Sequence, residues 1–291
     1  MSRLRPAVAL AGLVVVAAVL PAVPQLLRPG LPGLTDATGL SGAGLLAGDA
    51  DPPQVVRLAV GGAQRAYLYA PARRVPRLGD PGLLVVLPAA NRTVQQTYSQ
   101  LGLDAFRDHG LAVAVASALE GWNAGTCCGE AARDGVDDVA ALRVVTDDAA
   151  RRAGADRDRV ALLGYSTGGF MVYRLLCEGS LDVRAAVEVA GSLATSCRER
   201  RDVPPTLAVH GSDDDTVPLG PSDEVVPVLG VVPLSVREAV SRLSTAAGCA
   251  PDPDDCPVRL DEVADAGHRW EDLQPTGRIA AFLADAVPGV R

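Results

Sequence analysis

The sequence of 291 residues predicts an α/β fold, in which helices cover both faces of a mostly parallel, twisted sheet. Two observations support this prediction. Short, continuous apolar runs recur along the chain, as expected of strands that are buried on both faces. Segments with a helical spacing of apolar residues separate these runs, and strands that alternate with helices specify a parallel sheet.

The first two expected strands form a hairpin. Residues 55–60 and 65–69 flank the pair Gly61-Gly62, and glycine readily adopts the backbone conformation that a tight hairpin turn requires. Residues 258–263 are strand-like and close the series. The buried strands between them are expected at residues 83–87, 111–116, 160–163, 185–189 and 206–209.

The expected helices show an apolar face and a polar face. In residues 136–153, apolar side chains recur at helical spacing, and Asp137 and Asp138 stand in the first turn, where negative charge favours the positive end of a helix. The other helices are expected at residues 94–108, 169–178, 236–247 and 276–286.

The N-terminal residues have the features of an export signal. Residues 1–24 combine two early arginines with a short apolar run. This run is shorter than the roughly 20 residues that cross a bilayer, so we expect cleavage, with a retained membrane tether as the alternative. Residues 25–51 are rich in Leu, Pro and Gly without any period and predict a linker. Residues 52–291 are long enough for one domain with a sizeable core.

Composition excludes several kinds of function. All 27 basic residues are arginine. A P-loop, a Schiff-base enzyme and a Ser-Lys dyad each need a lysine amine, so these classes are excluded. The formal net charge of -8, without a concentrated basic patch, argues against a nucleic-acid partner, because the phosphates would be repelled.

The six cysteines form an even set, which fits export to an oxidising compartment. Cys249 and Cys256 are the expected local pair, and closing so small a loop stabilises by about 2.5 kcal/mol. A bridge between neighbours is strained, so at least one cysteine of Cys127-Cys128 is expected to pair with Cys177 or Cys197. The spacing does not suit a zinc site, and no metal is expected.

The segment Gly164-Tyr165-Ser166-Thr167-Gly168 carries the most information about chemistry. It lies between the apolar run 160–163 and a predicted helix. A serine at a tight strand-to-helix turn needs almost no side chain two residues away on either side, which explains both glycines. The following helix directs its first N–H groups toward a developing oxyanion. The context predicts a nucleophilic serine at Ser166.

A serine hydroxyl needs a base, and the chain has only 3 histidines. His109 stands at a predicted helix end, where it is expected to stop the helix. His210 ends a strand and is expected to be structural, although it borders the site. His268 follows the last predicted strand, where this kind of fold keeps its base. The acid is expected between the serine and the base, and the run Asp213-Asp214-Asp215 supplies three candidates.

Taken together, these segments resemble the secreted α/β-hydrolase esterases that are grouped with polyhydroxybutyrate depolymerases, feruloyl esterases and LpqC proteins. The likeness runs from about residue 83 to residue 270. It is carried by residues 122–125 with 127–129, 136–139, 164–169 with 173–175, 210–214 with 217–218, 247–249 and 267–270.

The resemblance implies an α/β-hydrolase fold for residues 52–291 and a serine esterase that needs no metal or organic cofactor. Matching the family's His-Gly-Thr-x-Asp to residues 210–214 selects Asp214 as the acid. The implied reaction therefore uses Ser166 as nucleophile, His268 as base and Asp214 as its partner.

The resemblance fails at one loop. Where the family usually has His-Gly after its third core strand, this chain has Pro88-Ala89 followed by Ala90-Asn91. The N–H groups of Ala90 and Thr167 are the expected oxyanion donors. Pro88 has no N–H, so a slower enzyme is expected, with the Asn91 amide as a substitute donor.

Trp122 and Trp270 both fall in loops that are expected to border the pocket. Substrate stacking and plain packing of the loops remain equal alternatives for both. Asn123, beside Trp122, is grouped with the candidate substrate-binding residues. Aromatic residues make up only 3% of the chain, which favours small or oligomeric esters over insoluble polymers.

The leading hypothesis is an exported serine esterase. An envelope acyltransferase on the same fold is one alternative, because the same acyl-enzyme could be passed to a sugar or lipid hydroxyl. The other alternative is an exported binding protein without catalytic activity, which the change at Pro88-Ala89 suggests.

Overall fold

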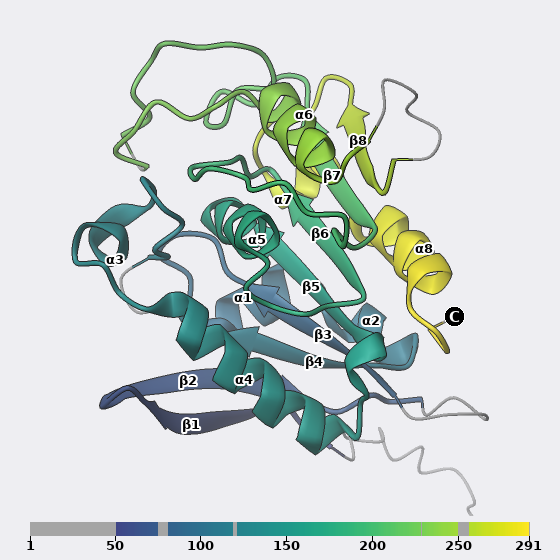
Figure 1. Cartoon of the computed structure of the whole chain (residues 1–291). Helices are drawn as coiled ribbons and strands as arrows, with labels where there is room; N and C mark the ends of the chain where they lie inside the picture. The colour runs from purple at the N-terminus through teal and green to yellow at the C-terminus, as the bar shows by residue number, and fades with distance from the viewer. Residues whose placement is uncertain (1–50, 75–80, 119–120, 228, 250–255, 291) are drawn as a thin grey trace, which may run out of the picture. The chain divides into compact units, whose positions relative to one another are not determined.

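The computed structural model describes residues 51–74, 81–118, 121–227, 229–249 and 256–290. These residues form an 8-stranded sheet with the order β1-β2-β4-β3-β5-β6-β7-β8 (Figure 1). The expected leader and nearly all of the expected linker lie outside the described residues. The strands are β1 Gln54–Val60, β2 Ala63–Ala70, β3 Gly82–Leu87, β4 Leu111–Ala116, β5 Val160–Tyr165, β6 Ala185–Val189, β7 Thr206–Gly211 and β8 Val258–Val263.

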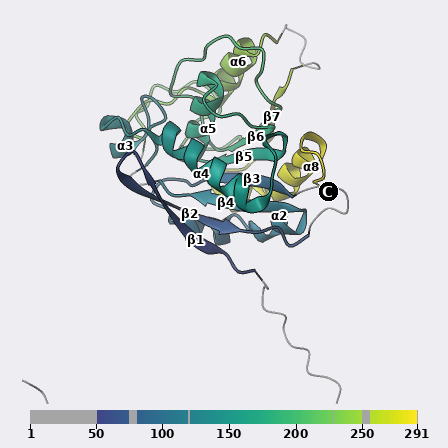
Figure 2. The ribbon, with the colours of Figure 1, turned by 60° about the horizontal axis from the view of Figure 1, so that its bottom comes forward.

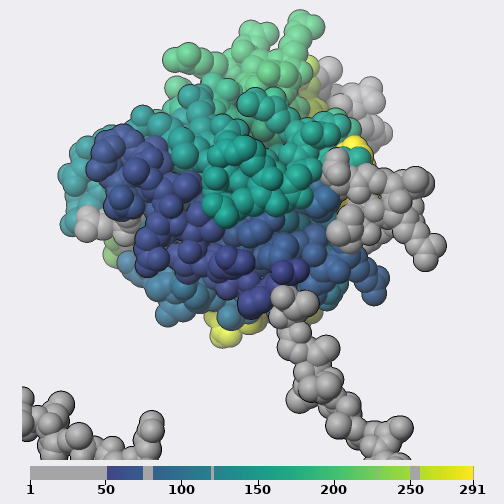
Figure 3. All heavy atoms as spheres, turned by 90° about the horizontal axis from the view of Figure 1, so that it is seen from below, coloured from purple at the N-terminus to yellow at the C-terminus, as the bar shows by residue number. Residues whose placement is uncertain are grey.

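Strands β3 to β8 run parallel, as the continuous apolar runs predict. The hairpin β1-β2 is antiparallel and joins the sheet through an antiparallel pairing of β2 with β4. Gly61 and Gly62 form its turn at φ values of 57° and 82°, which confirms the predicted hairpin. The hairpin lies at one edge of the sheet in Figure 2, and its atoms form the surface there in Figure 3.

Two layers of helices cover the sheet. Apolar side chains of α4, α5 and α6 pack on one face, and those of α1, α2, α7 and α8 pack on the other (Figure 1). The helices are α1 Val94–Gln100, α2 Asp104–Asp108, α3 Gly129–Arg133, α4 Asp138–Ala153, α5 Thr167–Glu178, α6 Val236–Ala246, α7 Trp270–Leu273 and α8 Thr276–Ala286.

The prediction of a single helix at residues 94–108 is wrong. The segment forms two short helices, because Gly102 between them adopts a left-handed φ of 61° that ends the first helix. Leu101 and Leu103, on either side of this glycine, are buried, so the break directs two leucines into the core. The prediction failed because the helical spacing of apolar residues continues through the turn at Gly102.

The start of α4 differs from the expectation in one respect. Asp137 lies before the first turn as the N-cap, and its side chain accepts a hydrogen bond from the Ala140 N–H. Asp138 is fully buried and forms an ion pair of 3.0 Å with Arg65 on β2. This aspartate therefore ties the hairpin to α4 in addition to its place at the helix end.

The cysteines pair as Cys249–Cys256, Cys177–Cys197 and Cys127–Cys128. The first pair confirms the prediction, and the neighbouring pair Cys127–Cys128 contradicts it. The expectation that one of these neighbours reaches Cys177 or Cys197 fails because those two cysteines bond each other: one lies near the end of α5 and the other in the loop after β6.

In the described part of the chain, no helix is both long and apolar enough to cross a membrane.

Candidate active site

Ser166 lies at the turn between β5 and α5, at a φ of 54° and a ψ of -118°. A positive φ is uncommon for a residue with a side chain and is held by its surroundings. The Ser166 N–H donates a hydrogen bond of 2.8 Å to the carbonyl of Val189 at the end of β6. This bond anchors the turn to the neighbouring strand.

The two glycines of the motif are required by close backbone contacts. A Cβ atom on Gly164 would lie 2.2 Å from the carbonyl oxygen of Gly168. A Cβ atom on Gly168 would lie 2.1 Å from the carbonyl oxygen of Leu87, the last residue of β3. Only glycine at both positions lets the helix start so close to the sheet.

The structure brings Ser166, His268 and Asp214 together, although they come from three separate loops. His268 Nε2 lies 2.9 Å from Ser166 Oγ, and His268 Nδ1 lies 2.8 Å from Asp214 Oδ2. Because a carboxylate only accepts, Nδ1 carries the proton, and in the neutral ring Nε2 is then the acceptor that faces the serine hydroxyl. This arrangement can remove a proton from Ser166.

Burial distinguishes Asp214 from its two neighbours in the sequence. Its side chain is buried, whereas Asp213 and Asp215 are exposed. Its Oδ1 atom accepts hydrogen bonds from the N–H groups of Thr216 at 2.9 Å and Val217 at 2.8 Å. Such bonds fix the carboxylate in the orientation that holds His268.

The environment keeps Asp214 ionised. Burial raises the pKa of its carboxyl, but hydrogen bonds from His210 and His268, the charge of His268 and the Val217 N–H outweigh this effect. The net pKa of Asp214 lies well below its usual range. A negative charge is therefore available to stabilise a protonated imidazole at His268.

The other two histidines do not reach Ser166. His109 is the C-cap of α2, as expected of a residue that ends a helix. His210 is fully buried on β7, with Nε2 2.7 Å from the carbonyl of Val217 and 3.1 Å from Asp214 Oδ2. It therefore contacts Asp214 rather than Ser166.

The expected oxyanion donors belong to the two turns that follow β3 and β5, and Gly168 packs closely against Leu87 at the end of β3. Thr167 is the first residue of α5, so its N–H has no acceptor within the helix. Ala90 and Asn91 form the turn after β3, with Asn91 exposed at a left-handed φ of 57°. Pro88, which lacks an N–H, contributes its carbonyl as the acceptor for the Trp122 indole at 2.9 Å.

Three of the expected substrate-binding residues have structural partners. Trp122 is only 1% exposed and packs beneath the turn after β3. Asn123 donates from Nδ2 to the Val136 carbonyl and accepts at Oδ1 from the Gly125 N–H. Trp270 is 5% exposed and packs edge-on against the Tyr165 ring. The burial of Trp122 and Trp270 favours packing against the protein over direct stacking on a substrate, and Trp270 begins helix α7 instead of lying in the expected loop.

Two residues near the site were not anticipated from the sequence. The Tyr165 hydroxyl donates a hydrogen bond of 3.0 Å to the carbonyl of His268. Glu188 is fully buried on β6, where it accepts from the Gly191 N–H at 2.9 Å and the Tyr173 hydroxyl at 3.2 Å. A lone carboxylate in an otherwise apolar strand was the available signal for Glu188.

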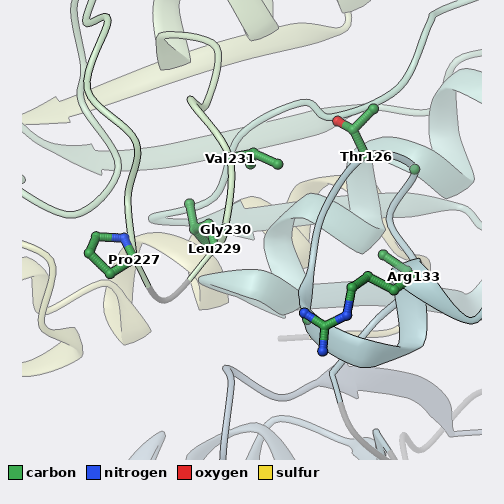
Figure 4. A pocket seen from close by; sticks show the side chains of 9 residues that line it. Thr126, Arg133, Pro227, Leu229, Gly230 and Val231 are labelled. Atoms are coloured by element: carbon green, nitrogen blue, oxygen red, sulfur yellow. The ribbon is translucent and has the colours of Figure 1, made fainter.

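A cavity of about 420 Å³ lies between α3 and the loop that precedes α6 (Figure 4). Arg133 and Pro227 stand on either side of it in Figure 4. Its wall continues along the loop that holds Trp122, since Gly125 and Thr126 line it.

Among the described residues, no three His, Cys, Asp or Glu side chains are grouped so that they could hold a metal ion.

Comparison with known proteins gives one related sequence of low similarity and many similar folds. No family model matches the chain. "Putative esterase NocK" from Nocardia uniformis subsp. tsuyamanensis is 30% identical over 204 residues, which are 65% of this chain and 58% of that protein. The chain thus spans well under two thirds of the length of this relative.

Solved structures of an esterase and of a serine hydrolase share the architecture. A thermostable esterase superposes with a TM-score of 0.58 at 16% identity, over 81% of this chain and 63% of that chain. The fluorophosphonate-binding serine hydrolase FphF of Staphylococcus aureus superposes with a TM-score of 0.55 at 11% identity, over 81% of this chain and 99% of that chain. The parallel sheet, the turn at Ser166 and these likenesses together establish that the chain has the α/β-hydrolase fold.

Proposed function

We propose that this protein is a serine esterase that hydrolyses carboxylic esters. The observation that carries the proposal is the continuous hydrogen-bond chain from Ser166 through His268 to Asp214, with links of 2.9 and 2.8 Å. A hydroxyl, an imidazole and an ionised carboxylate in this order activate the serine as a nucleophile.

The reaction proceeds through an acyl-enzyme. His268 Nε2 accepts the hydroxyl proton as Ser166 Oγ bonds to the ester carbonyl carbon, and Asp214 stabilises the resulting imidazolium. The proton then passes to the leaving alcohol as its bond to carbon breaks. Water attacks the acyl-enzyme with His268 again as base, which releases the acid and restores the serine hydroxyl.

The negative charge on the carbonyl oxygen needs hydrogen-bond donors. The Thr167 N–H, at the positive end of the 12-residue helix α5, is one proposed donor. The Ala90 N–H is the second, because its turn follows β3 and Gly168 packs against the end of that strand. Loss of one such donor typically slows turnover by about 10² to 10³.

The proposal extends to export of the protein from the cell and to the class of its ester substrate. The sequence features of residues 1–24 and the three cysteine pairs support export from the cell. The likeness to feruloyl esterases and polyhydroxybutyrate depolymerases supports an ester substrate, and the low aromatic content of 3% supports a small or oligomeric one. The buried positions of both tryptophans support the same choice, since neither offers a flat platform for an insoluble polymer.

Labelling with a fluorophosphonate probe tests the nucleophile. The protein is expected to react with the probe, and the Ser166→Ala variant is expected not to react. A panel of esters that varies the acid and the alcohol halves then identifies the substrate class. An added alcohol in the same assay distinguishes hydrolysis from acyl transfer by its product. A folded protein that neither labels nor hydrolyses any ester contradicts the proposal.

A further inference from the structure

His210 lies directly behind the proposed triad, with its whole side chain buried. Its Nε2 atom faces two acceptors, the carbonyl oxygen of Val217 at 2.7 Å and Asp214 Oδ2 at 3.1 Å. Neither oxygen can donate, since one is a carbonyl and the other belongs to an ionised carboxylate. Nε2 of His210 therefore carries a proton, whether the ring is neutral or charged.

Asp214 thus receives hydrogen bonds from two imidazoles at one oxygen. Its Oδ2 atom accepts from His268 Nδ1 at 2.8 Å and from His210 Nε2 at 3.1 Å. Its Oδ1 atom is occupied by two backbone N–H groups, those of Thr216 and Val217. A carboxylate has about four acceptor positions, so no position is left for another donor. Each bond holds the carboxylate in place and withdraws charge from the oxygen that faces His268.

The groups around His210 favour its role as a donor to Asp214. Glu188, on the neighbouring strand β6, is buried with Tyr173, and it adds negative charge beside His210 when its carboxyl is ionised. On the other side, Glu262 of β8 lies beside His210 in the sheet register and is bound by Arg237 of α6 at 2.7 Å. Burial lowers the pKa of His210. The hydrogen bond to Asp214 and the charges of Glu188 and Asp214 raise it by more than burial lowers it, so the net pKa of His210 is raised.

We propose that His210 is a positioning residue that acts on the reaction through Asp214. By sharing Oδ2 it fixes the carboxylate and limits the negative charge that stabilises the His268 imidazolium. The bond from His210 therefore sets how strongly Asp214 stabilises the His268 imidazolium that forms in the reaction. This inference rests on the proposed function, in which His268 is the base.

The tautomer of His210 is the first test, and it uses the unaltered protein. With 3 histidines in the chain, ¹⁵N-histidine labelling gives three rings that two-bond ¹H–¹⁵N spectra can separate. His210 is expected to carry its proton at Nε2 throughout the neutral range. A proton on Nδ1 with a bare Nε2 overturns the proposal without any assay of activity.

Variants of His210 provide the second test. His210→Phe removes the donor, so the acid limb of the kcat/KM profile is expected to move upward by roughly half to one pH unit. His210→Gln keeps a neutral donor and is expected to move it less. Leu207→Ala, a buried change earlier on the same strand, is the matched control for loss of stability and is expected to leave the limb in place.

The outcomes separate this inference from the proposed function. An acid limb that stays in place in an active, folded His210→Phe variant overturns the role of His210. If the unaltered protein fails to label or turn over esters, the proposed function fails instead. The His268 ring signals still decide the inference in that case, because they are expected to titrate at higher pH in His210→Phe than in the unaltered protein.

Discussion

Tyr165 and His268 are linked both through the backbone and through their rings. The Tyr165 hydroxyl donates a hydrogen bond of 3.0 Å to the His268 carbonyl, and the two ring centroids lie 5.9 Å apart with an interplanar angle of 25°. Tyr165 precedes Ser166 in the chain. The residue before Ser166 therefore holds the loop of His268, so the serine and the imidazole are positioned by one element.

This link predicts that Tyr165→Phe lowers kcat while leaving the fold intact. The ring contact remains, but the loop loses a partly buried hydrogen bond worth about 1 kcal/mol, which corresponds to a loss of about fivefold in turnover. Tyr98→Phe is the matched control, because it removes a hydrogen bond to Asp104 on the α1–α2 side of the fold. Steady-state kinetics with urea unfolding distinguishes the two variants. Equal kcat in both tyrosine variants contradicts the link.

The contact between Gly168 and β3 predicts a severe effect from one methyl group. In Gly168→Ala the new Cβ would lie 2.1 Å from the Leu87 carbonyl oxygen, so the turn must move and fluorophosphonate labelling should be lost. Gly277→Ala is the control, because no atom beyond the adjoining residues and backbone of its own helix lies within 4 Å of the new Cβ, and the residue is exposed in α8. That change should stabilise the protein by up to about 1 kcal/mol. Normal labelling of Gly168→Ala contradicts the geometry of the turn.

The strands β3 to β7 were predictable because each is a mainly apolar run bounded by turn residues, and a buried parallel strand needs no other feature. Helix α8 was predicted with the bounds that the structure shows. The break at Gly102 was not predictable, since a glycine within an apolar spacing is compatible with both a helix and a turn. The helices α3 and α7 span only 5 and 4 residues, too few to show a helical period.

The candidate site was only partly predictable from the residues. The motif around Ser166 and the strand order pointed to the serine and the base, but local sequence could not choose among Asp213, Asp214 and Asp215. That choice depends on burial, which results from folding of the whole chain. The second imidazole on Asp214 was missed for the same reason: a histidine at a strand end does not reveal which carboxylate it will meet.

The cysteine pairs predict a specific peptide map. Digestion without reductant should release Cys177 joined to Cys197, and Cys249 joined to Cys256, while Cys127 and Cys128 remain in one peptide that loses 2 Da on bonding. Mass spectrometry of protein exported to an oxidising compartment makes the measurement, with reduced and alkylated protein as the control. A cross-link from Cys127 or Cys128 to Cys177 contradicts the pairing.

Asp214 and Glu188 predict opposite effects of pH on stability. The pKa of Asp214 is lowered on folding, so its stabilising contribution is present above about pH 4 and is lost as the pH falls further. Burial raises the pKa of Glu188 to about 7, with the His210 charge, the Gly191 N–H and Tyr173 opposing this rise. The folded chain therefore binds a proton that the unfolded chain has released. Between about pH 4.5 and 7, stability should fall as the pH rises.

Glu188→Gln isolates the second effect. Glutamine stays neutral and can still accept from the Gly191 N–H, so the variant should lack the decline and should exceed the unaltered protein by roughly 3 kcal/mol in free energy of unfolding at pH 8. At pH 4.5 the two proteins should be nearly equal. Glu262→Gln is the control, since Arg237 lowers the pKa of this partly exposed carboxyl. Urea unfolding at pH 4.5, 6 and 8 makes the measurement. Parallel pH dependence of Glu188→Gln and the unaltered protein would show that Glu188 is ionised at no cost, and the buried charge would then need a closer cation than the structure provides.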